Sequence, residues 1–278
     1  MKKLNKKFDY LLKNKKFLIM LHRGAHGGNI IENTSNAVNI AIKQGTDIVE
    51  IDISKSTDGY FYVFHDGGEL RLLNEKRNIN KMSSSDIESK FYYNELGALL
   101  NQKVQRLSEL FLQVPTNVFI NIDRSWEHWK TFIPYLDNFK DRHEYFILKS
   151  PIKKEFLDIL ETHPIKYMYL PIIYNLEELS LLETYKNINV IGFEIIENSE
   201  DFNFIKSSRF DNYKKGGYMF MANSINLDDD TQLFGSLSDY LAITQDPILS
   251  WGKMLKLGIN TIQTDWVDLL FKYRNDNF

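Results

Sequence analysis

The feature that most constrains this chain is a regular alternation of short apolar runs with longer segments of helical pattern. The apolar runs have the length and composition of strands and lie at 17–21, 47–53, 117–123, 145–150, 167–173, 189–196, 218–225 and 261–265. Stretches such as SNAVNIAIKQ and KKEFLDILETH separate them. This alternation indicates parallel βα units. Eight units in a chain of this length predict an α/β fold, a closed (β/α)8 TIM barrel.

One interruption breaks the alternation. GYFYVFHD, at 59–66, has the pattern of an extra strand, and the sequence that follows it has no strong periodicity. We interpret this stretch as an insertion at about 66–105 within a single domain, 1–278. It is short and polar, so we expect it to lack a core of its own.

The N-terminal segment is basic, but its longest apolar run, FLIML, is too short for a signal-peptide core or a membrane span. Leu4, Phe8, Leu11 and Leu12 have helical spacing, which predicts a helix that covers the bottom of the barrel rather than a membrane anchor. We therefore expect a cytoplasmic protein without a stable membrane anchor. The acidic run at 228–230 is expected to be a solvated loop.

The amino-acid composition limits the kinds of reaction that the chain could catalyse. The chain has no cysteine, which excludes disulfides, thiolate metal sites and thiol nucleophiles. Its net charge of −3 gives no sign of a nucleic-acid partner. Any reaction must use histidine, carboxylates, lysine, serine or a metal.

Polar residues collect where the expected strands end. His22 and Arg23 follow the first run, and His65 ends the extra strand. Asp123 ends the third barrel strand and Lys149 the fourth. Because the C-terminal ends of the strands form the active face of such a barrel, we expect these side chains to converge.

Carboxylates dominate this group. Glu50 and Asp52 are two residues apart on one strand, so their side chains lie on the same side. With Asp123 they would repel one another unless a cation lies between them. Oxygen ligands favour Mg²⁺ or Ca²⁺. Arg23 offers a donor fork for a phosphate, and a histidine pair can serve as general base and general acid.

These residues carry a family resemblance. HRG at 22–24, ENT at 32–34, E-x-D at 50–52 and HD at 65–66 resemble the signature of the glycerophosphodiester phosphodiesterases. VQRLSEL, INID and LGINTIQTDWVDLL are similar to later segments of that family, so the resemblance covers nearly the whole chain. The spaced combination is specific, whereas each piece alone would be weak.

The resemblance implies a role for each matched residue. His22 and His65 would be the catalytic acid and base, in either order, and Arg23 would hold the phosphate. Glu50 and Asp52 would bind the metal. Glu32, in the ENT position, would bind or orient at the metal site.

The chain departs from the family at the third strand. Where the family has E-x-K, this sequence has Asp123 and Ser125. Arg124 is expected on the opposite face of the strand, which leaves Lys149 as the substitute cation for the phosphate, unless it is a surface lysine. Asp123 has a second interpretation, as the cap of the helix near Trp126.

Two further acidic residues are expected to be structural. Glu194 is interpreted as part of an ion pair or as a rim residue, and Asp265 as a residue that fixes a loop through nearby backbone.

The sequence predicts metal-dependent hydrolysis of a small-molecule phosphodiester, a glycerophosphodiester, to sn-glycerol 3-phosphate and an alcohol. Two alternatives remain: a related phosphodiesterase for another head group, of lysophospholipase D or sugar-phosphodiester type, and a catalytically silent phosphodiester-binding module.

Overall fold

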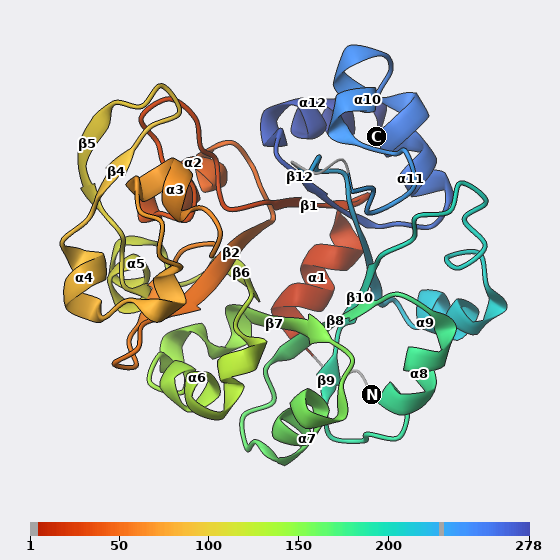
Figure 1. Cartoon of the computed structure of the whole chain (residues 1–278). Helices are drawn as coiled ribbons and strands as arrows, with labels where there is room; N and C mark the ends of the chain where they lie inside the picture. The colour runs from red at the N-terminus through yellow and green to blue at the C-terminus, as the bar shows by residue number, and fades with distance from the viewer. Residues whose placement is uncertain (1–4, 228–230) are drawn as a thin grey trace.

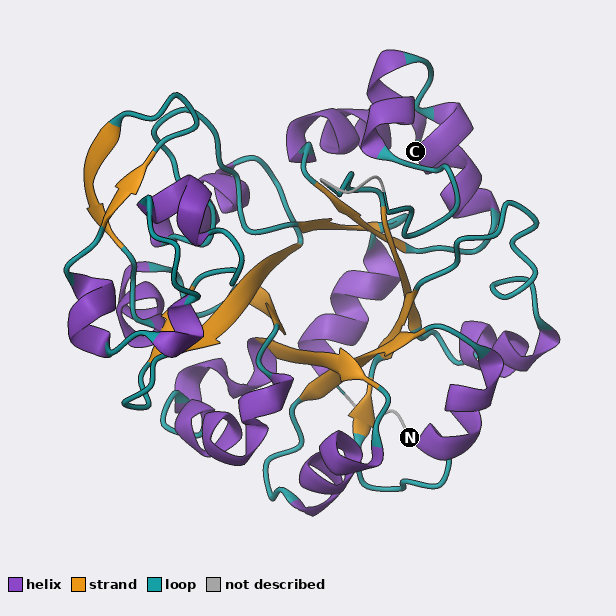
Figure 2. Cartoon of the chain, viewed as in Figure 1, coloured by secondary structure: helices purple, strands orange, loops and turns teal. Residues whose placement is uncertain are grey.

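The computed structural model describes residues 5–227 and 231–278, in which a ring of parallel strands is surrounded by helices (Figures 1 and 2). The ring is formed, in spatial order, by β1 (Leu18–Leu21), β12 (Thr261–Thr264), β11 (Met219–Asn223), β10 (Gly192–Ile195), β8 (Met168–Ile173), β7 (Phe146–Pro151), β6 (Phe119–Asp123) and β2 (Ile48–Lys55). β1 pairs with both β12 and β2, which closes the barrel. The eight-stranded barrel predicted from the sequence is confirmed.

Helices follow the strands and pack on the outside of the ring, as Figure 2 shows. They are α2 (Ser35–Lys43), α5 (Leu107–Gln113), α6 (Trp129–Leu136), α7 (Lys154–Thr162), α8 (Leu176–Leu182), α9 (Asp211–Lys215), α10 (Asp239–Thr244), α11 (Lys253–Lys256) and α12 (Val267–Asn277). Their apolar sides and the outward-facing strand residues form the main core, which is continuous around the barrel.

Shorter elements complete the chain. They are β9 (Asn189–Val190), which pairs with β8, the 3-10 turns at Ile79–Lys81, Trp126–His128, Lys140–Tyr145 and Ser208–Phe210, and a π-helical turn at Ile248–Gly252. Within the described residues every helix is too short or too polar to span a bilayer. The acidic run 228–230 lies outside the described residues.

The N-terminal helix α1 (Lys6–Asn14) lies behind the ring of strands in Figure 1. Phe8 is fully buried and meets the ring of Phe119 edge-on at 5.4 Å. It belongs to a second core cluster with inward-facing strand residues such as Leu18 and Met168. The predicted helix at the bottom of the barrel is therefore confirmed, although Leu4 lies outside the described residues.

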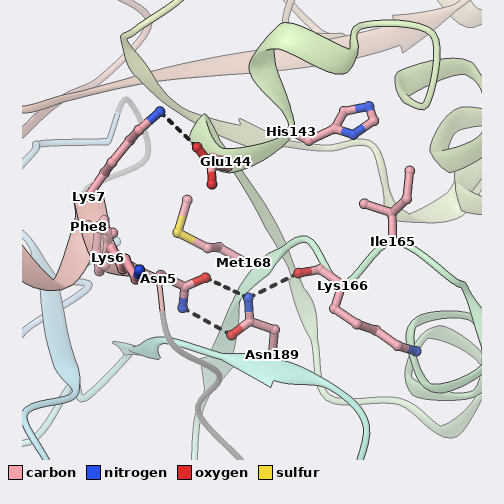
Figure 3. A pocket seen from close by; sticks show the side chains of 10 residues that line it. All are labelled: Asn5, Lys6, Lys7, Phe8, His143, Glu144, Ile165, Lys166, Met168 and Asn189. Carbon is pink, nitrogen blue, oxygen red and sulfur yellow. Dashed lines mark hydrogen bonds and ion pairs between the residues drawn. The ribbon is translucent and has the colours of Figure 1, made fainter.

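A cavity of about 450 Å³ lies beside α1 at this end of the barrel (Figure 3). Its polar groups bond to each other: the side-chain amides of Asn5 and Asn189 exchange hydrogen bonds of 3.1 and 2.9 Å, and Lys7 lies 2.7 Å from Glu144. These contacts tie the helix to the barrel at the end opposite the predicted catalytic residues.

The stretch after β2 forms a lobe beside the barrel, at the upper left of Figure 1. It contains β3 (Phe61–Val63), which pairs antiparallel with β2, then α3 (Glu69–Leu73), α4 (Ser84–Glu88) and the hairpin of β4 (Phe91–Tyr93) and β5 (Leu99–Lys103).

The inserted stretch is expected to lack a core of its own, and its buried side chains pack together with residues from outside it. A separate cluster of buried side chains fills the lobe: Ile31, Tyr62, Phe64, Leu72, Leu73, Ile79, Met82, Ile87, Tyr92 and Val104. Three of them come from β3, its flank and the loop after β1. The lobe therefore builds its core jointly with the barrel, which a reading of the polar stretch alone does not reveal.

Candidate active site

The turn after β1 places the first pair of predicted residues. Arg23 and Gly24 both have positive φ, 54° and 74°. A side chain at Gly24 would lie within 2.8 Å of the backbone of Ala37, so glycine is needed where the turn meets α2. The turn directs the backbone N–H of Arg23 to Glu50, whose Oε2 accepts it at 2.9 Å.

The carboxylates meet because of strand register. β2 and β6 are parallel neighbours, and Asp52 is the direct partner of Asp123. Glu50 is on the same side of β2 as Asp52. One oxygen from each of the three lies within 4.8 Å of the others, which is the convergence that the sequence predicts.

The electrostatics of this group are unfavourable without a cation. Burial, and next the charge of Asp52, raise the pKa of Glu50 to about 8. Oε1 of Glu50 is buried without a hydrogen-bond partner among the described residues. Asp52 differs: burial raises its pKa, but the charges of Arg23, His65 and His22 outweigh this and lower it.

This set of donors fits a hard divalent cation. Three carboxylates converge, one buried oxygen has no partner, and the negative charge is incompletely balanced. Oxygen donors of this kind are the ligands that Mg²⁺ and Ca²⁺ prefer. Glu50, Asp52 and Asp123 are therefore the residues able to hold a metal.

The two histidines line one cavity of about 280 Å³ together with Arg23, Asp52, Asp123 and Lys149. Their environments differ. Burial lowers the pKa of His65 below its usual value. Burial acts in the same direction on His22, but a hydrogen bond to Asp265 and the charge of Glu50 outweigh it and raise its pKa.

Glu32 lies between two arginines instead of joining the carboxylate group. It lies 2.9 Å from Nη1 of Arg23 and 2.9 Å from Nη1 of Arg71, an α3 residue in the lobe. Burial raises the pKa of Glu32, but the hydrogen bond from Arg71 and the charges of both arginines lower it to about 2. Arg23 also places Nε 3.1 Å from Oδ2 of Asp52, so its guanidinium is held on two sides.

Lys149 is buried at the end of β7, and its interpretation as a surface lysine is wrong. Its Nζ contacts the carboxylate of Asp123 and lies 3.1 Å from Oε2 of Glu194. Burial lowers the pKa of Lys149, but these carboxylates outweigh it and raise the pKa above its usual value. The prediction that Glu194 forms an ion pair is confirmed.

The structure also decides two questions about the end of β6. The 3-10 turn at Trp126–His128 has Ser125 at its N-cap position, and the backbone N–H that donates to Asp123 is that of the adjacent Arg124, so Asp123 does not cap the helix near Trp126. Arg124 has a φ of 57° and lines the same cavity as Asp123. The expectation that it lies on the opposite face is wrong, because the strand ends at Asp123 and its alternation does not continue.

Sequence reasoning missed several supporting residues. Asn33 donates to Asp52 at 2.9 Å and accepts from its backbone N–H at 2.9 Å. Asp265 contacts His22 rather than fixing a loop, at 2.9 Å. The buried Asp239 accepts from Thr264 and from the backbone of Asp265, each at 2.9 Å. The positions of Asn33 beside Glu32 and of Asp265 at a strand end were available signals, whereas Asp239 lies on α10 without a motif.

Two protein-family models match parts of this chain. The glycerophosphoryl diester phosphodiesterase family model matches residues 22–191, and a model for a domain of unknown function matches residues 168–274. A curated glycerophosphodiester phosphodiesterase from Bacillus altitudinis is 31% identical over 109 residues, covering 38% of this chain and 44% of the relative. The match therefore spans less than half of that relative's length.

Solved structures agree in fold. A glycerophosphoryl diester phosphodiesterase from Parabacteroides distasonis has a TM-score of 0.75 at 15% identity, over 95% of this chain and 87% of its own. One from Thermotoga maritima has a TM-score of 0.62 at 20% identity, over 92% and 98%. A phosphodiesterase from Oleispira antarctica, solved with the product sn-glycerol-3-phosphate, has a TM-score of 0.65 at 17% identity, over 94% and 97%.

The family match extends from the HRG turn through β9, more than half of the chain, and includes every carboxylate of the candidate metal site. The chain belongs to the glycerophosphoryl diester phosphodiesterase family.

Proposed function

We propose that this protein hydrolyses glycerophosphodiesters to sn-glycerol 3-phosphate and an alcohol, with Mg²⁺ or Ca²⁺ as cofactor. The observation that carries the proposal is that His22, His65 and Arg23 share one cavity with Asp52 and Asp123, two of the three converging carboxylates. Family membership and the product-bound relative from Oleispira antarctica support the same substrate class.

Glu50, Asp52 and Asp123 would hold the metal. When bound, the metal neutralises charge on the phosphate oxygens. Arg23 binds the phosphate with a guanidinium that Glu32 and Asp52 hold in position. Lys149 also lines the cavity and contributes a fixed positive charge toward the anionic substrate.

The histidines divide the proton transfers. His22 has Nδ1 against the carboxylate of Asp265, which leaves Nε2 available for the substrate and favours the protonated ring. We assign it the proton donation to the leaving alkoxide. His65, which follows β3, accepts the proton from the nucleophile, which is water or the glycerol 2-hydroxyl.

The test is release of sn-glycerol 3-phosphate from glycerophosphocholine and glycerophosphoethanolamine, with Mg²⁺, Ca²⁺ or EDTA. We expect release that requires the metal and disappears in His22→Ala and His65→Ala. Binding of the substrate without turnover in any metal would contradict hydrolysis and favour a silent binding module.

A second set of substrates tests which alcohol the phosphodiester must carry. Lysophosphatidylcholine and a sugar phosphodiester are assayed beside the glycerophosphodiesters under the same conditions. We expect the glycerophosphodiesters to have the highest kcat/KM. A higher value for either of the others would contradict the proposed substrate class while leaving phosphodiester hydrolysis intact.

A further inference from the structure

Arg124 occupies an unusual backbone conformation beside the candidate site. It is the residue directly after Asp123 and the end of β6, and its φ of 57° lies in the left-handed region. Residues other than glycine adopt this conformation at a free-energy cost, and such positions cluster at functional sites. Here the conformation brings Arg124 to the cavity that His65 and Asp123 also line.

The turn that carries Arg124 is firmly anchored. The next residue, Ser125, is fully buried, and its Oγ accepts a hydrogen bond of 3.0 Å from Nε1 of the buried Trp129. The backbone carbonyl of Ser125 accepts from the N–H of His128 at 2.9 Å. The position of Arg124 is therefore fixed by the packing behind it.

Among the described residues, the guanidinium of Arg124 has one carboxylate neighbour, and it keeps hydrogen-bond donors available. Its Nη2 lies 3.2 Å from Oδ1 of Asp66, the residue after His65, and its side chain is 40% exposed. A guanidinium has five N–H donors, and one ion pair leaves most of them available to a ligand. Asp66 holds the group close to His65 without burying it.

The other two cations of the cavity are more fully engaged. Arg23 contacts the carboxylates of Glu32 and Asp52, and the buried Lys149 contacts those of Asp123 and Glu194. Arg124 is thus the cation in this cavity whose donors are most accessible to an anion. The paired N–H donors of an arginine guanidinium match the geometry of two phosphate oxygens.

We propose that Arg124 binds the phosphate group of the substrate directly, and that Asp66 holds its guanidinium in place. This inference rests on the proposed phosphodiester chemistry and adds a substrate-binding residue to it. Arg124 supplies a contact from the β6 end of the cavity, whereas Arg23 supplies one from the β1 end.

The test compares Arg124→Ala and Arg124→Lys with Arg209→Ala. Arg209 is a matched control because it is 38% exposed and 3.1 Å from Glu183, between helices outside the barrel. The dissociation constants of sn-glycerol 3-phosphate and inorganic phosphate are measured by calorimetry in Mg²⁺, beside kcat/KM for glycerophosphoethanolamine. We expect Arg124→Ala to weaken binding by about 10- to 100-fold, as for loss of a charged hydrogen bond.

Arg124→Lys should keep part of the affinity, because lysine retains the positive charge but lacks the paired N–H donors of the guanidinium. Arg209→Ala should bind the phosphate as tightly as the wild type. Arg124→Gly separates ligand binding from backbone strain. Glycine adopts the left-handed conformation freely, so Arg124→Gly should have a higher melting temperature than Arg124→Ala. It should bind the phosphate as weakly as Arg124→Ala does, because both lack the guanidinium.

The outcomes separate the two proposals. If the wild type binds and hydrolyses the substrate while Arg124→Ala binds as tightly as Arg209→Ala, the role of Arg124 is overturned and the proposed function stands. If the wild type neither binds the phosphates nor hydrolyses any diester, both proposals are overturned.

Discussion

Nδ1 of His22 lies 2.9 Å from Oδ1 of Asp265, although the two residues are 243 positions apart in the chain. They follow β1 and β12, the first and last barrel strands, in which Leu21 pairs with Thr264. Closure of the barrel therefore creates this pair. Asp265 is itself held by Asp239, which accepts its backbone N–H.

Asp265→Asn should lower the pKa of His22, because it keeps a side chain of the same size but removes the negative charge that favours the imidazolium. NMR titration of the His22 ring would show its midpoint at lower pH than in the wild type. His163 pairs with Asp137 on the outside of the barrel and provides an internal control. An unchanged His22 midpoint would contradict the role given to Asp265.

Glu50 should make the metal-free protein less stable as pH rises. Its pKa is about 8 in the folded protein against a usual value of 4.5, so between these values the native state holds a proton that the unfolded state has released. The free energy of unfolding then falls with increasing pH across this window, by roughly a few kcal/mol. The raised pKa of His22 acts in the same direction.

The measurement is urea denaturation at pH 5 and pH 8 in EDTA, for the wild type and Glu50→Gln. Glutamine keeps an oxygen for the N–H of Arg23 but does not ionise. The variant should lose less stability between the two pH values than the wild type. An equal loss in both proteins would show that Glu50 ionises normally.

Divalent metal should stabilise the folded protein, because the carboxylates of the proposed cation site converge only in the barrel. At a free metal concentration 100 times the Kd, the gain is about 2.7 kcal/mol. Differential scanning calorimetry with Ca²⁺ or Mg²⁺ should show a higher Tm for the wild type and little change for Asp52→Asn. Asp276→Asn, on the surface of α12, is the control that should respond like the wild type.

Lys149→Met should destabilise the metal-free protein strongly, because it leaves Asp123 and Glu194 without their shared cation. Loss of one partner of a buried ion pair costs about 3–5 kcal/mol. Lys154→Met breaks an exposed pair with Asp158 and should cost under about 1 kcal/mol. Denaturant titration distinguishes the two, and equal effects would contradict the structural importance of Lys149.

The barrel and the meeting of the carboxylates were predictable because they follow from local periodicity. Strand-length runs give the eight strands, and two-residue spacing puts Glu50 and Asp52 on one side of β2. Parallel register then places Asp123 opposite Asp52. The backbone needs no unusual conformation for any of these relationships.

The errors came from contacts and conformations that local patterns do not encode. Arg124 leaves the strand pattern through a positive φ, and Asp265 meets a histidine from the other end of the chain. The core of the lobe includes Tyr62 and Ile31, which lie outside the inserted stretch, so the composition of that stretch alone does not reveal it. Tertiary structure decides each of these points.

The carboxylate of Glu32 is shared between Arg23 of the barrel and Arg71 of the lobe. The lobe therefore cannot be exchanged without affecting the residues around Glu32. A chimera that replaced it with the corresponding segment of another barrel would remove Arg71 as a counter-charge of Glu32 and would leave the Glu32 carboxylate to Arg23, the proposed phosphate ligand. Such a graft would have to supply its own cation at the same position, so α3 contributes a residue that supports the proposed active site.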